Sequence, residues 1–376
     1  MAGIYLHIPF CKRRCLYCDF YSTTRDEMKH RYTAALCKEL ELRKSYIDGE
    51  PIETIYWGGG TPSQLSREDF EQVFETIHHI YKVSPDAEIT IEANPDDLND
   101  EYVSMLRTLP FNRLSMGIQT FNDESLSLLH RRHTAQQAIE AFRRCRDAGF
   151  NNISIDLMYG LPNETEQTWA NDLEQAIEMR PEHISAYHLI YEEGTPLWKL
   201  REQHRVEEAD EDLSVRLFTM LIHRLKEAGY QHYEISNFSL PGLHSRHNSS
   251  YWVGKKYLGC GASAHSFDGH SRQWNVASID RYIDAAENGT LDFEIEELDQ
   301  ATRYNDFVIT AIRTCWGMSL DKLKTDFGTR LHDYCLRMAR PHIEQGTLQI
   351  TDGTLRLTEQ GIFVSDGIMS DMLWVE

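Results

Sequence analysis

The chain carries Tyr5-Leu6-His7-Ile8-Pro9-Phe10-Cys11-Lys12-Arg13-Arg14-Cys15-Leu16-Tyr17-Cys18 near its start, a short apolar segment followed by three closely spaced cysteines. Thiolates are soft ligands that select zinc, copper(I) or iron–sulfur clusters. A structural zinc site takes four ligands, usually as two separated pairs, and no second pair follows these three. The C-x3-C-x2-C spacing therefore favours a cubane 4Fe-4S cluster held by Cys11, Cys15 and Cys18, with one iron left open to a small molecule. A zinc site or three ordinary free cysteines are the alternatives.

Strand and helix patterns alternate over most of the chain after the cysteines. Counting the apolar segment before them, we expect strands at residues 4–8, 52–57, 88–93, 113–117, 152–156 and 183–188, each followed by a helical pattern, the last at 211–228. Repeated strand–helix units predict a parallel sheet with the helices outside it. Six such units make an α/β fold, an open, three-quarter version of the eight-fold (β/α) barrel. A further strand at 232–236 would extend the sheet.

Unusual polar residues stand at the ends of these expected strands. The cysteines follow the first strand, and a run of three glycines, 58–60, follows the second. The next four strands end at or near Glu92, Gln119, Asp156 and Tyr187-His188. Working residues of (β/α) barrels gather at the carboxyl ends of the strands. We therefore expect all of these residues on one rim of the barrel.

Composition narrows the class of protein. The 59 acidic and 38 basic side chains give a net charge of −21, which repels phosphate backbones and argues against nucleic acid as a partner. Eight cysteines in 376 residues are too few for a disulfide scaffold. We find neither a secretory leader pattern nor an apolar run of the ~20 residues that a membrane helix needs. We expect a soluble, cytoplasmic protein without an integral membrane segment, and peripheral membrane contact stays open.

A change of pattern after residue 294 indicates a smaller C-terminal domain. Helical segments at 300–315, 320–327 and 331–345 precede a hairpin at 348–357 with an Asp352-Gly353 turn, and a final helix follows. This order predicts a winged-helix-like α+β domain. It holds 8 basic and 13 acidic side chains, so we interpret it as a cover or protein-contact domain and not a DNA reader. The expected division is a barrel at 1–235, a sheet extension at 236–294 and this domain at 295–376.

The cysteine spacing, with an aromatic residue just before Cys18, resembles the radical S-adenosylmethionine (SAM) superfamily. The preceding Tyr-x-His-Ile-Pro-Phe-Cys resembles one branch of it, the oxygen-independent coproporphyrinogen III oxidases and their haem-chaperone relatives. The resemblance implies a partial barrel, a 4Fe-4S cluster, and SAM chelated to the open iron through its amino and carboxylate groups. The oxidase pattern has a fourth cysteine where this chain has Phe20, and an extension before the first strand that is not seen here.

The resemblance gives roles to two of the expected strand ends. The backbone of Gly59, Gly60 and Thr61 would hold the amino group of SAM, because glycine lets a ligand approach the backbone closely. Glu92, in Glu-Ala-Asn-Pro, would take the ribose of SAM. A plain turn is the alternative for the glycines, and a surface glutamate is the alternative for Glu92.

Further positions match by the same resemblance. Gln119 and Arg131 would contact polar groups of SAM, although a solvated helix end is the alternative for Arg131. Asp156 closes an apolar strand, so its carboxylate needs a ligand hydroxyl or a backbone amide as partner. Tyr5 and Tyr17 would frame the cluster and SAM.

The segment His247-Asn248-Ser249-Ser250-Tyr251-Trp252 fits the pattern H-N-x-x-Y-W, which resembles the haem-chaperone branch. Neutral imidazole is a common ligand of haem iron, so His247 is the first candidate for haem contact. A solvated loop histidine is the alternative, because the chain has 17 histidines. Cys260 is a second candidate, since thiolates also bind haem iron.

Three functions compete on this basis. A haem chaperone would bind haem and pass it to haem-accepting proteins. A coproporphyrinogen oxidase would use SAM for oxidative decarboxylation of propionate side chains in porphyrin biosynthesis. A structural protein would keep a vestigial cluster, which the retained SAM-binding positions disfavour. Phe20 favours the chaperone over the oxidase, and a homodimer stays open.

Overall fold

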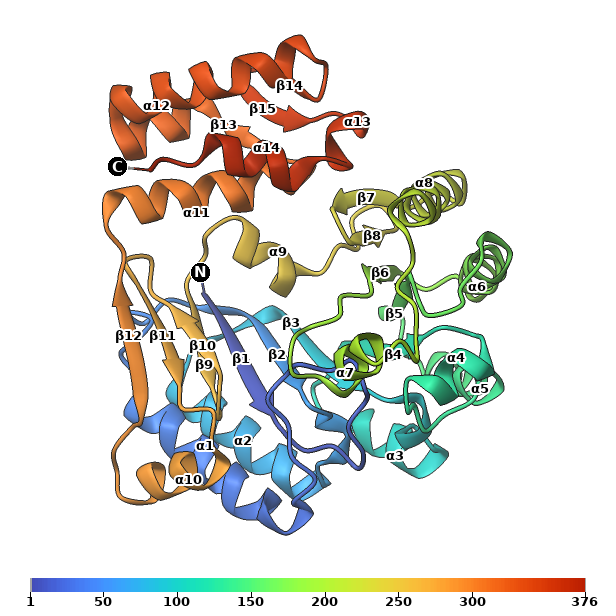
Figure 1. Cartoon of the computed structure of the whole chain (residues 1–376). Helices are drawn as coiled ribbons and strands as arrows, with labels where there is room; N and C mark the ends of the chain where they lie inside the picture. The colour runs from blue at the N-terminus through green and yellow to red at the C-terminus, as the bar shows by residue number, and fades with distance from the viewer. Residues whose placement is uncertain (1, 376) are drawn as a thin grey trace.

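Six parallel strands form the centre of a twelve-stranded sheet in the computed structural model, which describes residues 2–375 (Figure 1). Each strand pairs with the next one along the chain. They are β1 (Ala2–Ile8), β2 (Ile52–Gly59), β3 (Val83–Ala93), β4 (Arg113–Gln119), β5 (Ile153–Tyr159) and β6 (His183–His188). The predicted partial (β/α)6 barrel is therefore confirmed.

Helices connect these strands and cover the outer face of the curved sheet (Figure 1). The α-helices are α1 (Lys29–Leu42), α2 (Arg67–Ile80), α3 (Asp100–Leu106), α4 (Asp123–Leu128), α5 (Ala135–Asp147), α6 (Glu166–Met179), α7 (Pro196–Glu202) and α8 (Glu211–Glu227). Short 3-10 turns are η1 (Asp26–Met28), η2 (Pro62–Gln64) and η3 (Pro95–Asp97). The start of helix α2 is set by its local sequence. Ser66 and Asp69 form a capping box there, which satisfies backbone N–H groups that have no helical partner.

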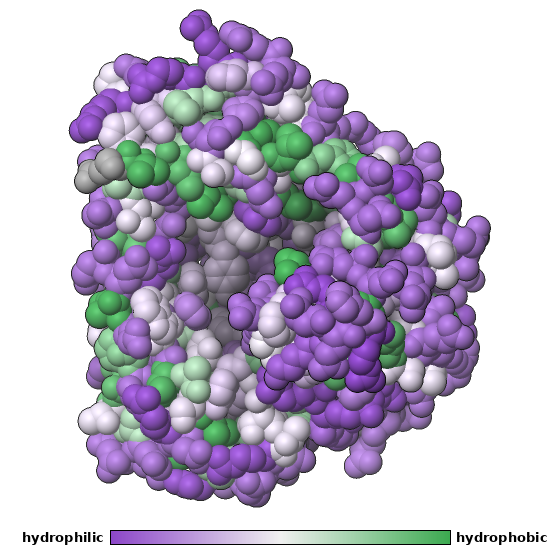
Figure 2. Space-filling model, viewed as in Figure 1, coloured by the Kyte–Doolittle hydropathy of each residue, from purple (hydrophilic) through white to green (hydrophobic). Residues whose placement is uncertain are grey.

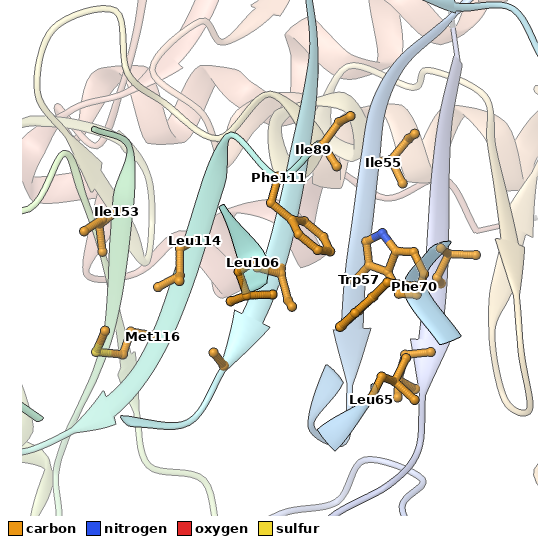
Figure 3. Packing of buried hydrophobic residues seen from close by; sticks show 14 of the residues in the cluster. Ile55, Trp57, Leu65, Phe70, Ile89, Leu106, Phe111, Leu114, Met116 and Ile153 are labelled. Carbon is orange, nitrogen blue, oxygen red and sulfur yellow. The ribbon is translucent and has the colours of Figure 1, made fainter. Parts of the chain in front are cut away.

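The main core lies between the outer face of the sheet and the helices. Trp57 of β2 is fully buried and meets Phe70 of α2 edge-on, with ring centroids 5.0 Å apart. Phe111 packs on both rings, at 6.1 Å from Trp57 and 5.3 Å from Phe70 (Figure 3). Burying each large side chain contributes about 1.5–3 kcal/mol, so this aromatic group anchors α2 to the sheet.

Alternation along each strand places polar side chains on the inner face. On β5, Ile153, Ile155 and Leu157 are fully buried toward the helices, while Ser154 and Asp156 lie between them in sequence. Successive side chains of a strand point to opposite faces, so Asp156 points into the barrel. The other central strands repeat this pattern, which gives the barrel a polar interior.

Strands at both edges extend the sheet. Beyond β1 lie β9 (Tyr257–Cys260), β10 (His265–Phe267), β11 (Ser271–Asn275) and β12 (Phe293–Glu297), and beyond β6 lie β8 (Asn237–Ser239) and β7 (Gln231–Glu234). Strand β7 matches the expected strand at 232–236, and β9 pairs with β1 in parallel. Helices α9 (Arg246–Trp252) and α10 (Ile279–Glu287) lie among these strands in the sequence.

The C-terminal residues build a smaller α+β unit with its own hydrophobic cluster (Figure 1). It contains α11 (Gln300–Ile312), β13 (Met318–Ser319), α12 (Leu320–Glu344), β14 (Leu348–Thr351), β15 (Thr354–Leu357), α13 (Glu359–Ile362) and α14 (Ser365–Met372). Gly328 breaks α12 with a φ of 81°, at the gap between the two helices expected there. The hairpin of β14 and β15 turns at Asp352 and Gly353, as predicted. The winged-helix-like class is confirmed, and the exact domain limits stay a prediction.

None of the helices within residues 2–375 is both long enough and apolar enough to span a membrane.

Candidate functional site

The cysteine loop lies at the carboxyl end of β1. The N–H of Cys11 donates to the Thr23 carbonyl at 2.8 Å, and the N–H of Thr23 donates to the Pro9 carbonyl at 2.7 Å. The Thr61 hydroxyl donates to Cys11 Sγ at 3.4 Å. Cys11 is buried, while Cys15 and Cys18 are partly exposed. The loop is thus tied to β1 and to the end of β2, with two of its thiols accessible.

A cavity of about 400 Å³ opens beside this loop, and we name it the rim cavity. Its lining includes Cys11, Cys15, Tyr17, Cys18, Gly59, Gly60, Thr61, Glu92, Gln119, Arg131 and Asp156. The structure therefore gathers the three cysteines and eight further residues that the sequence, read with its family resemblance, assigned to the cluster and SAM. Tyr5 and His247 do not line it.

The rim cavity fits a cluster better than a single metal ion. Among the described residues, no group of three His, Cys, Asp or Glu side chains could hold one metal ion. In a cubane cluster each thiolate binds a different iron, so the three sulfurs stand apart across the cluster. Burial raises the pKa of Cys18 to about 11 and also raises the pKa of Cys11. These two thiols are therefore protonated at neutral pH, and iron binding must displace their protons.

The glycine run packs the end of β2 against the cysteine loop. A Cβ at Gly59 would lie 2.7 Å from the His7 ring, and one at Gly60 would lie 2.7 Å from the Pro9 backbone. Gly59 also has a φ of 107°, which side chains rarely allow. The Gly60 N–H donates to the Ile8 carbonyl at 2.8 Å. The glycines thus permit close contact within the protein, and they leave their backbone on the cavity wall.

Glu92 holds a carboxylate in the barrel interior. The Tyr56 hydroxyl donates to its Oε1 at 2.7 Å, and the Gly59 N–H donates to its Oε2 at 3.2 Å. Burial, together with the nearby Asp156 carboxylate, raises the pKa of Glu92 to about 7. The surface alternative for Glu92 is therefore wrong, and near neutral pH this carboxyl is poised to gain or lose a proton.

Asp156 is the second carboxylate of the interior. The Ser115 hydroxyl donates to its Oδ1 at 3.5 Å. Burial raises the pKa of Asp156 to about 6, while hydrogen bonds from Ser185 and Ser115 oppose that rise. The hydrogen-bond donors to Asp156 within the protein are thus serine hydroxyls. The sequence had suggested a backbone amide or a ligand hydroxyl.

Arg131 turns its guanidinium into the site. It donates from Nη2 to Asn94 Oδ1 at 2.7 Å and to the Gly117 carbonyl, and from Nη1 to Cys15 Sγ at 3.4 Å. The alternative interpretation of Arg131, a solvated side chain at a helix end, is therefore wrong. The contact with Cys15 sets a cation beside one of the three sulfurs of the cysteine loop.

Gln119 ends β4 in a strained conformation. Its φ of 73° lies in the left-handed region, and the register of β4 against β5 shifts between Gly117 and Gln119. Such strain costs on the order of 1–3 kcal/mol and clusters at functional sites. Gln119 lines the rim cavity at this bulge.

His247 lies at the opposite end of the barrel from the cysteine loop. Its Nδ1 is 2.8 Å from Thr54 Oγ1, and its Nε2 is 2.8 Å from the Tyr251 hydroxyl. Its ring is 1% exposed and stacks on Tyr5 and Tyr56. Burial lowers the pKa of His247 to about 3, so the ring is neutral. Both ring nitrogens are occupied within the protein, and the role of His247 toward haem stays a prediction.

A second and larger cavity of about 860 Å³ adjoins the barrel, and we name it the lateral cavity. Its walls come from β1, the end of the cysteine loop, α9, β9 to β11, α11 and α12. Figure 2 shows the molecule hollowed here, with apolar surface on the side of the C-terminal domain. Tyr5 lines this cavity, and Phe20, which is 68% exposed, lines both cavities.

Sequence reasoning missed several residues of the rim cavity. Asn94 holds Arg131 and donates to Thr61, and it follows Glu92 by two positions in the quoted Glu-Ala-Asn-Pro. Ser115 was missed as well, whereas Tyr187, which also lines the cavity, was expected on this rim. The alternation of β4 could have placed Ser115 on the inner face, whereas the bond of Asn94 to Arg131 joins segments that no sequence pattern connects.

The fold and the three-cysteine rim define a radical SAM protein, a class that implies a 4Fe-4S cluster and SAM as cofactors. The family model described as the radical SAM superfamily matches residues 5–176, and the model of the HemN C-terminal domain matches residues 298–364. The solved structure of coproporphyrinogen III oxidase (HemN) from Escherichia coli has a TM-score of 0.85 and 23% identity, covering 99% of this chain and 89% of that chain. At that identity the likeness shows the fold alone.

Sequence comparison places the chain more narrowly. It is 32% identical to the heme chaperone HemW of Bacillus subtilis (strain 168), over 99% of both chains. It is 37% identical to the heme chaperone HemW of Escherichia coli (strain K12), over 70% of this chain and 69% of that one. The chain belongs to the HemW family, the haem-chaperone branch of the oxygen-independent coproporphyrinogen III oxidase-like proteins.

Proposed function

We propose that this protein is a haem chaperone that binds a 4Fe-4S cluster, SAM and haem, and delivers haem to haem-dependent proteins. The observation that carries the proposal is the pair of adjoining cavities. The rim cavity gathers three cysteines with two interior carboxylates and an arginine, and the lateral cavity offers a larger space with aromatic walls. The name of the full-length relatives, heme chaperone HemW, supports the same function.

Different residues of the rim cavity would bind the cluster and SAM. Cys11, Cys15 and Cys18 would hold the cluster, which when bound supplies an open iron for SAM and one-electron chemistry. Arg131 already donates to Cys15 Sγ, so it would keep a charged hydrogen bond to one sulfur that holds the cluster. In this proposal Gln119 and the backbone at Gly59, Gly60 and Thr61 contact the polar groups of SAM, and Tyr17 closes the wall beside it.

The two interior carboxylates would accept hydrogen bonds from ligand hydroxyls. Each carboxylate oxygen of Glu92 already accepts one hydrogen bond, Oε1 from the Tyr56 hydroxyl and Oε2 from the Gly59 N–H. A carboxylate has about four lone-pair sites, so both oxygens retain capacity for a ribose hydroxyl. The raised pKa values of Glu92 and Asp156 make this binding weaker below neutral pH, where the carboxyls hold protons.

The lateral cavity has the size and lining that a haem needs. Small-molecule sites typically measure about 300–1,000 Å³ and combine aromatic walls with a few polar groups. Phe20 stands on the wall shared with the rim cavity, at the position where the oxidase pattern has a cysteine. A bare apolar ring there suits packing on a porphyrin face, and it offers no fourth thiol. These features favour the chaperone over a coproporphyrinogen oxidase.

Haem capture and release test the proposal. The anaerobically reconstituted protein is titrated with haem, desalted and then mixed with a haem-free globin as acceptor. We expect one haem per chain after desalting, followed by transfer of that haem to the globin. Haem that is lost on desalting, or that stays with the protein in an excess of acceptor, would refute a chaperone function.

A further inference from the structure

One histidine of the lateral cavity has no hydrogen-bond partner for its ring among the described residues. Two histidines line this cavity, His7 and His265. The His7 ring contacts the Tyr5 hydroxyl at 3.1 Å and the Tyr21 carbonyl at 2.9 Å. His265 is exposed, and within residues 2–375 neither of its ring nitrogens has a hydrogen-bond partner.

The surroundings of His265 fix the orientation of its ring and leave both ring nitrogens free. The residue lies on β10, whose hydrogen bonds to β11 fix the backbone, and its ring stacks on Trp274 with 6.0 Å between centroids and 27° between planes. Burial, and then the nearby Arg272, lower the pKa of His265. The imidazole is therefore neutral at pH 7, with a lone pair free for a metal ion.

One arginine of the lateral cavity makes no close ion pair with any described residue. Arg272 pairs with Glu296 at 3.2 Å, and Lys322 pairs with Asp326 at 2.5 Å. Arg303 of α11 makes no ion pair within 4.0 Å among the described residues, and its buried Nε has no hydrogen-bond partner. A buried donor without a partner is unfavourable, so this guanidinium gains from a bound anion.

Aromatic rings complete the lining between these two side chains. Tyr257 and Phe267 come from β9 and β10, at 6.4 Å between ring centroids. Phe307 and Phe327 come from α11 and α12, at 5.5 Å. A free imidazole, an unpaired guanidinium and aromatic walls match the three parts of haem, which are the iron, the propionates and the porphyrin faces.

We propose that the lateral cavity is the haem-binding site, with His265 as an axial ligand of the iron and Arg303 as the partner of a propionate. This inference rests on the proposed function and names its site. His247 then acts as a positioning residue, because it holds the Tyr251 hydroxyl at 2.8 Å and stacks on Tyr5, and both of these residues line the cavity.

Ferric haem titrations of wild type, His265→Gly and Arg303→Gln test the assignment, with His79→Ala as the control on the exposed surface of α2. We expect His265→Gly to shift the Soret band and weaken haem binding about tenfold or more. Added imidazole should restore the wild-type spectrum, because the vacated space admits it. The control should match wild type.

Two ligand analogues separate the roles of the two side chains. Iron-free protoporphyrin IX should bind wild type and His265→Gly equally, because it makes no axial bond. Haem dimethyl ester lacks propionate charge, so Arg303→Gln should weaken haem binding roughly 10- to 100-fold and leave binding of the ester unchanged.

Each outcome decides one question. Failure of the wild type to bind haem would refute the proposed function itself. Stoichiometric haem binding by wild type with an unchanged spectrum and affinity in His265→Gly would refute the site alone. Thermal unfolding monitored by circular dichroism checks that both variants fold, and imidazole rescue gives a readout that misfolding cannot produce.

Discussion

Replacing Glu92 with glutamine should change how the stability of the cluster-free protein depends on pH. Burial and the neighbouring Asp156 raise the pKa of Glu92 from an ordinary 4.5 to about 7. Between these two values the folded state binds a proton that the unfolded chain has lost. Stability therefore falls as pH rises from about 4.5 to 7, and the loss is complete above pH 7.

The size of the effect follows from the pKa difference. One pKa unit corresponds to 1.36 kcal/mol, so ionising Glu92 alone would cost the folded state about 3 kcal/mol. Asp156 titrates in the same interval, and part of the cost belongs to the pair, so we expect about 1–3 kcal/mol for Glu92 itself. Glu92→Gln cannot ionise, and it should therefore become more stable relative to wild type by that amount between pH 5 and pH 8.

Urea unfolding under anaerobic conditions measures this difference. Wild type, Glu92→Gln and the control Glu71→Gln are unfolded at pH 5 and at pH 8, and the change in unfolding free energy is compared. Glu71 lies on α2 with its side chain 46% exposed, and among the described residues its one ion pair is with Arg67, so its variant should follow wild type. If Glu92→Gln lost the same stability as wild type between the two pH values, Glu92 would not be the proton-binding carboxyl of the barrel interior.

Three further predictions concern the cofactors and the cavity wall. Replacing all three loop cysteines with alanine should abolish a content of about four irons per chain, whereas Cys315→Ala should keep it; a full cluster in the triple variant would remove the loop from iron binding. Asp156→Ala should weaken SAM binding by about 1.5–3 kcal/mol with iron content unchanged, and equal calorimetric affinity would exclude this carboxylate from the site. His247→Ala should shift the Soret band and weaken haem binding, by less than His265→Gly does, because it acts through Tyr251; an unchanged spectrum would assign His247 to stability alone.

The sequence predicted the barrel and its rim well, because both rest on local patterns. Each central strand carries a period-two or buried pattern, and each is followed by a turn and an amphipathic helix. Parallel strands end at one edge, so the sequence alone could place Glu92 and Asp156 together. The C-x3-C-x2-C spacing alone was enough to predict that the three cysteines share one loop.

The remaining features depend on contacts between distant segments. His247 fitted a haem-ligand pattern, but its environment is set by Thr54, nearly two hundred residues earlier. Strands β8 to β12 are short, and their pairing with the sheet edges determines their conformation more than their own sequences do. The lateral cavity combines β1, β10 and α11, so the free state of His265 could not be read from any single stretch of the chain.

The central claim is that this radical SAM protein carries haem rather than making a porphyrinogen. Its most direct test incubates the reconstituted protein with SAM, a reductant and either haem or coproporphyrinogen III, and then measures bound haem and released CO2. The account predicts one haem retained per chain and coproporphyrinogen III left intact. Decarboxylation of coproporphyrinogen III over multiple turnovers by the pure protein would contradict it.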